Sequence, residues 1–244
     1  MIGTNQPECF SEEIIVRVSC KGDGTMLDKA AGTHQPAVVA NRRKFCEAVG
    51  IHYDDVVYQR VAYSDDQTYD KIAIVDASHT SSSIDEVAAD ALITTDSGVG
   101  LFLPVADCVG TVLYDQPTRQ LAIAHLGRHS TIAGLMTKTL AHMQQHGASA
   151  EDILIWMAPS VQKESYKMEY FTQANDPQWQ DFMLSTAEGI HLNLQGYNRA
   201  RALEAGVRDE HIVISPVDTA IDEHYFSHSQ GDTAGRFAVI AYLT

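Results

Sequence analysis

The sequence is poor in basic residues and in cysteine. Of its 244 residues, 17 are Lys or Arg and 32 are Asp or Glu, so the formal net charge is -15. Such a surface repels the phosphates of nucleic acid and of anionic membranes, and we expect neither as a partner. The 4 cysteines show no CxxC spacing, which excludes a zinc ribbon and does not favour a disulfide framework. An anionic small molecule could bind only where basic side chains cluster.

Long apolar runs and targeting signals are absent as well. No run reaches the length of a membrane span, and the opening residues MIGTNQPECFSEE lack the basic and apolar regions of a signal peptide. We therefore expect a cytoplasmic protein. Low-complexity segments, internal repeats and linkers rich in Pro or Gly are also missing, so residues 1–244 are expected to form a single domain.

The apolar patterns that are present predict more strands than helices. Helices are expected at 36–50, at 134–147 with Ser130 as its cap, and within 189–206, while SHTSSSIDE reads as a loop. β-rich runs predict the strands IIVRVSC, DVVYQRVAY, KIAIVDA, ADALITT, VGLFLPVADC, CVGTVLY, QLAIAHL, DILIWMAP, HIVISPV and RFAVIAYL. Because several of these strands are adjacent hairpins, we expect a layered α/β or α+β fold with mixed sheets.

One hairpin brings together residues that can do chemistry. If 115–119 form the turn, the strands CVGTVLY and QLAIAHL run antiparallel, and Cys108 lies almost opposite His125. A thiol and an imidazole at cross-strand distance suit a nucleophile and its base, or two ligands of a soft metal. A buried cysteine beside a core histidine with no chemical role is the plain alternative.

Several stretches resemble one protein family in order and spacing. ADC followed by AHLG is similar to ADC-x-P and HAGWRG, ANRRKF to an NRR helix, and ADALITT to an ADALVT strand. Three further matches follow along the chain. The family text GPSIGPCCYEV is similar to APSVQKESYKM, and LDL…N…L…GV is similar to LNLQGYNRARALEAGV. The family's closing CT…FFSYRR…TGR is similar to DTAIDEHYFSHSQGDTAGRFAVIAYL. The stretches extend over most of the chain and resemble the laccase-domain family (YfiH type, also called multicopper polyphenol oxidoreductase or peptidoglycan editing factor).

The resemblance implies an α/β/β/α sandwich in which one Cys and two His hold a metal. It also implies an activity on purine nucleosides, namely phosphorolysis of adenosine, inosine or methylthioadenosine, deamination of adenosine, or both. Cys108 and His125 would be two of the ligands, with zinc as the expected metal and copper as the alternative. None of the 11 histidines occurs in a His-x-His pair, so a four-copper oxidase is not expected.

Phosphorolysis needs a cationic pocket for phosphate. The candidates are Arg42, Arg128 and Arg236, and His129, Ser227 and His228 are expected to add polar contacts to phosphate or ribose. Purine nucleoside and phosphate are then the expected partners of a monomer or weak homodimer.

The sequence departs from the family pattern at the first metal ligand. Where the family has the His of QVHG, the stretch QRVAYSDD has Ala62, which cannot ligate a metal. We expect His79, in the polar loop before ADALITT, to lie within about 4 Å of the Cys108 sulfur or of a shared ion. A site with two ligands, or one that recruits Tyr63 or His129, is the alternative.

The leading hypothesis is therefore a metal-dependent enzyme acting on purine nucleosides. A second hypothesis is a hydrolase with Cys108 as nucleophile and His125 as base, for which the editing-factor name suggests cell-wall precursors as substrates. A single-copper oxidoreductase of the same fold and a non-catalytic protein that binds nucleosides are the remaining alternatives.

Overall fold

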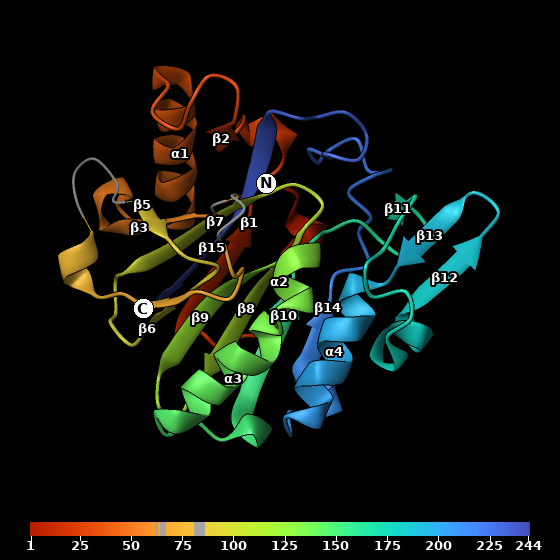
Figure 1. Ribbon diagram of the computed structural model, residues 1–244. Coiled ribbons are helices and arrows are strands. Elements are labelled where there is room, and N and C mark those ends of the chain that lie inside the picture. Colours follow the sequence, from red (N-terminus) through yellow and green to blue (C-terminus); the bar gives the residue numbers. More distant parts are fainter. Residues whose placement is uncertain (62, 64–66, 81–85) are drawn as a thin grey trace.

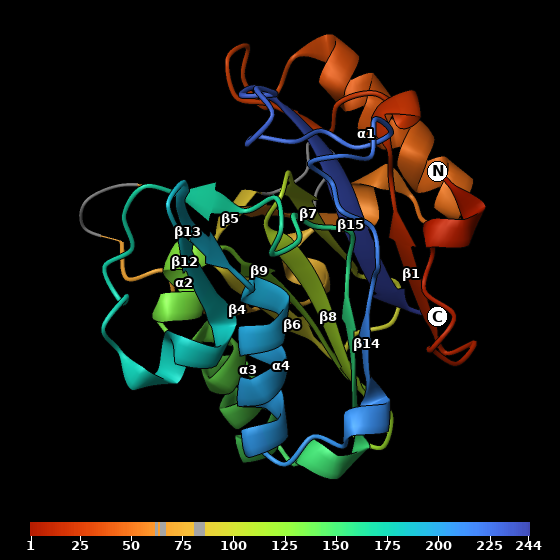
Figure 2. The same cartoon turned by 90° about the vertical axis from the view of Figure 1, so that its right-hand side faces the viewer.

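Two mixed β-sheets pack face to face, and helices cover their outer faces (Figure 1; Figure 2). The computed structural model describes residues 1–61, 63, 67–80 and 86–244. The first sheet has 6 strands, with β2 paired to β15 beside the main path. In spatial order its strands are β1 (Ile14–Val18), β15 (Gly235–Leu243), β7 (Gly100–Val105), β3 (Val56–Arg60) and β5 (Glu86–Ala88), with β2 at Leu27–Asp28.

The second sheet also has 6 strands and carries the predicted hairpin. Its spatial order is β14 (Ile212–Ile214), β10 (Ile153–Met157), β8 (Val109–Asp115), β9 (Gln120–Leu126), β6 (Ala91–Thr94) and β4 (Ile72–Ile74). A small antiparallel sheet projects from the body (Figure 1) and consists of β11 (Lys167–Met168), β13 (Gly189–Leu192) and β12 (Met183–Thr186).

The helices form the two outer layers. The α-helices are α1 (Pro36–Val49), α2 (Arg128–Ile132), α3 (Leu135–Gln145) and α4 (Leu194–Glu204). Single-turn or short 3₁₀ helices lie at Gly3–Asn5, Lys21–Asp23, Tyr53–Asp55, Ala77–His79, Ala150–Asp152, Pro177–Phe182 and Asp209–His211. None of the helices in the described part of the chain is long and apolar enough to cross a lipid bilayer.

Strand periodicity explains the layers. Along β15, Phe237 and Val239 point into the core between the sheets, whereas Ala238 and Ile240 face α1. Along β9, Leu121 and Ile123 join the same inner core, and alternate residues face α3 and α4. Because both faces of these strands are buried, their sequences are continuous apolar runs. The predicted layered α/β fold with mixed sheets is confirmed.

Some local predictions need correction. The hairpin is present, but Asp115 pairs with Gln120 inside the ladder, so that Gly110, and not Cys108, lies opposite His125. Asp115 stays in the strand because its carboxylate accepts the backbone N–H of Thr118 at 3.0 Å and closes a shorter turn.

The predicted helices at 134–147 and 189–206 begin differently from expectation. Ser130 lies within α2 and is not the cap of α3: its hydroxyl donates to His125 O at 2.6 Å and accepts the Gly127 N–H at 2.9 Å. Gly189–Leu192 pair with β12 as strand β13, so α4 starts only after Asn193, whose side chain accepts the Gly196 N–H. Much of the predicted loop SHTSSSIDE, residues 81–85, lies outside the described residues, as does Ala62.

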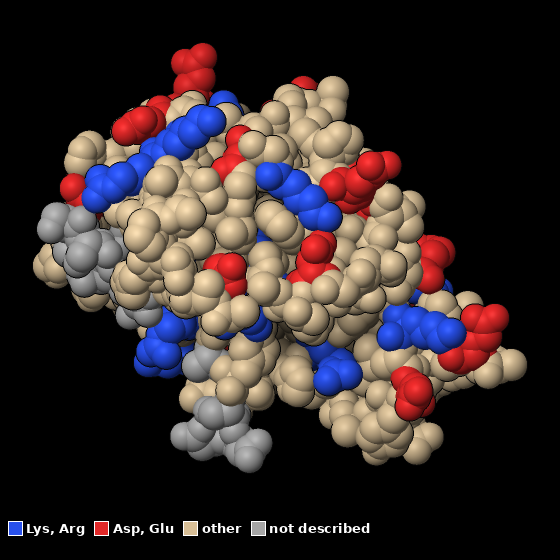
Figure 3. Space-filling view, turned by 90° about the horizontal axis from the view of Figure 1, so that it is seen from above, with Lys and Arg blue, Asp and Glu red and all other residues tan. Residues whose placement is uncertain are grey.

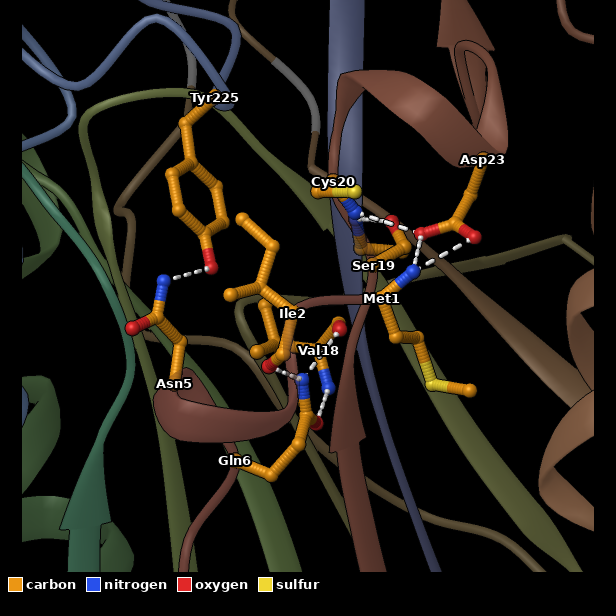
Figure 4. Close-up of polar contacts among 10 residues, drawn as sticks. Met1, Ile2, Asn5, Gln6, Val18, Ser19, Cys20, Asp23 and Tyr225 are labelled. Atoms are coloured by element: carbon orange, nitrogen blue, oxygen red, sulfur yellow. Dashed lines mark hydrogen bonds and ion pairs between the residues drawn. The ribbon is translucent and has the colours of Figure 1, made fainter.

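The amino-terminal segment is fastened to β1 and to the loop before β15 (Figure 4). The Gln6 carboxamide donates to Val18 O at 3.0 Å and accepts the Val18 N–H at 2.8 Å. The neighbouring Asn5 side chain donates to the Tyr225 hydroxyl at 2.9 Å. Tyr225 precedes the loop 227–234, so this segment braces the loop that reaches the cavity described next.

Candidate active site

A cavity of about 470 Å³ opens between the two sheets at the end where β7 stops and β8 begins. Cys108 and His125 both line it, together with groups from α2 and from the loop before β15. Basic residues in the lining are Lys29, Arg60, Arg128 and Arg236, and aromatic ones are Tyr58, Tyr63, Tyr69 and Tyr166. The volume falls in the range of small-molecule sites, which is about 300–1,000 Å³.

Cys108 and His125 are neighbours across a glycine. A Cβ atom built on Gly127 would lie 3.0 Å from Cys108 Sγ, 3.1 Å from His125 Cε1 and 3.6 Å from His125 Nε2. The absence of a side chain at Gly127 therefore lets the thiol and the imidazole share one small space. Cys108 and His125 remain neighbours despite the change of register, because Cys108 directly precedes Val109, the first residue of the ladder.

The His125 ring is held from one side. Its Nε2 lies 3.4 Å from the Tyr63 hydroxyl, with the two rings edge to face and 6.3 Å apart. Its Nδ1 is buried and has no hydrogen-bond partner among the described residues. Burial, reinforced by the positive charges of Lys29 and Arg236, lowers the pKa of His125 to about 4. The ring is therefore neutral at pH 7.

The Cys108 thiol is also neutral at pH 7. Burial and the adjacent Asp107 carboxylate raise its pKa to about 11, against the opposing charges of Arg236, Lys29 and Arg128. An activated cysteine nucleophile has the opposite shift, so the hydrolase hypothesis gains no support from this environment.

Asp107 locks the turn that presents Cys108. Its φ of 69° is in the left-handed region, which is costly for a residue other than glycine. Two hydrogen bonds hold it there: the Thr219 hydroxyl donates to Oδ1 at 2.8 Å and the Ser229 N–H donates to Oδ2 at 2.7 Å. The loops that precede β15 are thereby tied to the residue next to Cys108.

Three basic side chains, Lys29, Arg128 and Arg236, line the cavity around the Cys108–His125 pair. No ion pair joins Lys29, Arg128 or Arg236 to an acidic residue within the described ranges. Burial, followed by repulsion from Arg236, lowers the pKa of Lys29. Seen from above (Figure 3), acidic and basic side chains are both scattered over this side of the molecule, and some of the basic ones lie in recesses among uncharged residues. An anion bound between these cations would relieve their mutual repulsion.

The structure brings some of the predicted binding residues to the cavity and excludes others. Arg128, His129, His228 and Arg236 line it. Arg42 does not: it is 1% exposed, its Nε donates to Met26 O at 2.7 Å, and its guanidinium lies over the Tyr58 ring.

Ser227 is likewise outside the lining. Its backbone N–H is held by the Asp232 carboxylate, and its hydroxyl meets the Ser229 hydroxyl at 3.1 Å. Arg42 supports the wall behind Tyr58 and Ser227 shapes the loop, so the structure places neither residue in the cavity lining.

His79 is not brought to the Cys108–His125 pair. Its Nδ1 bonds to the Asp76 carboxylate at 3.0 Å within its own turn, and its side chain is 41% exposed and does not line the cavity. The local Asp76–Ser78–His79 turn satisfies this ring, so the loop does not deliver it to the sulfur.

The described residues do not supply a complete set of ligands for zinc or copper. Cys108 and His125 are close enough to share an ion, but among the residues placed by the structure no third His, Cys, Asp or Glu joins them. Catalytic zinc sites use three protein ligands. The described residues therefore do not fit a catalytic zinc site.

Sequence reasoning missed several residues of the lining, among them Tyr166 and Lys29. Tyr166 belongs to the stretch APSVQKESYKM, whose resemblance to the family text GPSIGPCCYEV could have indicated that it lies near the site. Lys29 reaches the cavity from the chain after β2 through long-range packing, and its sequence neighbourhood carries no pattern that indicates this.

Fold and cavity together define the class: an α/β/β/α sandwich with a Cys–His pair and a cationic pocket between its sheets. The chain belongs to the family described as multi-copper polyphenol oxidoreductase laccase, whose model matches residues 23–244. The predicted family is thus confirmed.

Relatives and solved structures agree with this assignment. The chain is 29% identical over 219 residues to a protein of Corynebacterium glutamicum named purine nucleoside phosphorylase, covering 89% of this chain and 86% of the relative. It is 28% identical over 203 residues to a protein named adenosine deaminase from an unknown prokaryotic organism, covering 79% and 76%. YlmD from Geobacillus stearothermophilus shares the fold, with a TM-score of 0.81 and 23% identity over 97% of this chain and 94% of that one.

Proposed function

We propose that this chain is an enzyme that cleaves purine nucleosides with phosphate. The observation that carries the proposal is the convergence of Lys29, Arg128 and Arg236 on the Cys108–His125 pair, in a protein whose net charge is -15. A cationic pocket on an acidic protein favours a small anion at that one place. The names of relatives at 26–29% identity support the same class of substrate.

Phosphate binds between the three cations in this proposal. Arg236 is fixed by its own Nη1, which donates to Asp232 O and Gly235 O at 3.2 and 2.6 Å, and so presents the rest of its guanidinium to the cavity. Arg128 Nη2 lies 3.2 Å from His129 Nε2, which orients that arm as well. Charge-assisted hydrogen bonds of this kind hold phosphate strongly.

The nucleoside occupies the aromatic part of the same cavity. Tyr69 and His129 form a ring pair with centroids 4.7 Å apart, and Tyr63 lies 6.1 Å from Tyr69. Flat aromatic surfaces of this kind stack on purines. Phosphate on the cations and the base on the rings place the ribose between them, beside Cys108.

The reaction balances without an external acid or oxidant. A phosphate oxygen forms a bond to ribose C1′ while the C1′–N9 bond breaks and its electron pair leaves with the purine. The proton of hydrogen phosphate ends on the purine, which gives ribose 1-phosphate and a neutral base. The residues of the cavity bind, orient and exclude water from the reacting atoms.

The test is incubation of the purified protein with adenosine or inosine, with and without phosphate, followed by chromatographic separation of the products. Phosphorolysis gives free base only when phosphate is present, whereas deamination converts adenosine to inosine without phosphate. Lys29→Met should reduce base release and Lys44→Met, an exposed change on α1, should not. Absence of base from every nucleoside would refute the proposal, and inosine alone would replace it with deamination.

A further inference from the structure

We propose that the Tyr63 hydroxyl is a catalytic group of this site, which passes the proton of hydrogen phosphate to the leaving purine. The inference rests on the proposed phosphorolysis and adds to it a residue for the proton transfer.

The Tyr63 side chain reaches the Cys108–His125 pair from the cavity. Its ring lines the cavity and its residue is 53% exposed, yet its hydroxyl points inward, 3.4 Å from His125 Nε2. The same imidazole edge faces Cys108 Sγ across Gly127. A phenol that reaches inward from an exposed position lies between the cavity mouth and the reacting pair.

Tyr63 also touches the proposed phosphate site. Lys29 Nζ lies 4.6 Å from the centroid of the Tyr63 ring, so the ammonium and the phenol face the same region. Phosphate held by Lys29 is therefore beside the Tyr63 hydroxyl. The Tyr63 side chain thus lies between the proposed phosphate site and the Cys108–His125 pair.

His125 orients the phenol. Because Nδ1 of His125 has no acceptor beside it in the described structure, the ring hydrogen is best placed on Nε2, from which it is donated to Tyr63 Oη. The Tyr63 O–H is then free to turn toward the substrate. His125 acts here as a positioning residue and keeps its own proton throughout.

The proton transfer is balanced. As the phosphate oxygen bonds to C1′, its O–H proton passes to Tyr63 Oη, and the phenolic proton passes to a nitrogen of the departing purine. Tyr63 ends the cycle as it began, and no further reactant is needed. A purine that receives a proton leaves as a neutral molecule, which is the purpose of general acid catalysis.

The experiment compares Tyr63→Phe with the unchanged enzyme on two ribosides in the presence of phosphate. Inosine needs a proton on its leaving group, whereas p-nitrophenyl riboside releases an anion that is stable without one. With inosine, kcat should fall about 100-fold, a typical contribution of a general acid, and KM for inosine and phosphate should change little. With the p-nitrophenyl riboside, kcat should stay within about twofold. Tyr170→Phe, a change at a surface tyrosine that is 73% exposed, is the matched control.

Each outcome tests whether Tyr63 transfers the proton. Equal losses with both ribosides would mean that Tyr63 merely shapes the pocket, and unchanged kcat with inosine would mean that it does not transfer the proton. Either result overturns the role of Tyr63 and leaves the proposed function intact. No base from the unchanged enzyme would overturn the proposed function and this role with it.

Discussion

Adding one methyl group at Gly127 should separate the two central side chains of the site. The new Cβ of Gly127→Ala would lie 3.0 Å from Cys108 Sγ and 3.1 Å from His125 Cε1. Favourable contacts between such atoms lie near 3.5–4.0 Å, so each neighbour must retreat by about 0.5 Å. The backbone is not the obstacle, because φ and ψ of -83° and 179° suit alanine.

The expected cost is larger for activity than for stability. Overpacking destabilises by about 1–3 kcal/mol. A displacement of about 1 Å can reduce rate about 100-fold, so half of it should reduce kcat/KM roughly tenfold. We would measure kcat/KM for inosine with phosphate, the thermal midpoint, and the alkylation rate of Cys108 by peptide mass analysis.

Gly100→Ala provides the matched control. Its Cβ would meet Ile51 and Val56 at 2.8 and 2.9 Å, which is slightly more crowded than at Gly127 but lies outside the cavity lining. It should lower the thermal midpoint and leave kcat/KM unchanged. If Gly127→Ala kept full activity and an unchanged alkylation rate, the close approach of Cys108 and His125 would have no functional meaning and the reasoning would be refuted.

Other predictions concern phosphate, the amino-terminal segment and pH. Lys29→Met should raise KM for phosphate about tenfold in steady-state assays, as loss of a charge-assisted bond implies, and an unchanged KM would count against a phosphate site there. Gln6→Ala removes hydrogen bonds at both ends of its carboxamide and should cost about 1–3 kcal/mol in urea unfolding; no change would mean that the segment is not anchored. The hydrogen bond from the Ser227 N–H, aided by Lys21, lowers the pKa of Asp232 below its usual 3.8, although partial burial opposes the shift. The ionised carboxylate therefore stabilises the fold above pH 3.8, and this stabilisation is lost as the pH falls through the pKa of Asp232 in the folded protein. Asp232→Asn should thus be less stable than the unchanged protein at pH 7, with a difference that shrinks in acid; a constant difference would contradict the argument.

The fold was predictable because its signals are local. Runs such as RFAVIAYL and QLAIAHL are apolar on both faces, and only a strand buried between layers requires that. The hairpin was predictable from its turn, but its register was not, since it depends on how the Asp115 side chain closes that turn.

The parts of the site that come from neighbouring strands could be predicted from the sequence, whereas the parts that come from distant segments could not. Cys108 and His125 belong to one hairpin, so spacing alone paired them. Lys29 arrives from the chain after β2, and no sequence spacing relates it to the hairpin. His79 was misplaced because the capping geometry of its own turn, which bonds it to Asp76, competes with any long-range contact.

The position of β15 has a consequence for how the molecule is made. β15 is the last strand in the chain, yet it lies between β1 and β7 within the first sheet. Until its residues leave the ribosome, β1 and β7 each present an unpaired edge, which is prone to wrong pairing. The loop 218–229, which holds Asp107, also emerges late, so the cavity cannot be assembled on a partly synthesised chain. A nascent molecule therefore cannot act on substrate before β15 has been synthesised.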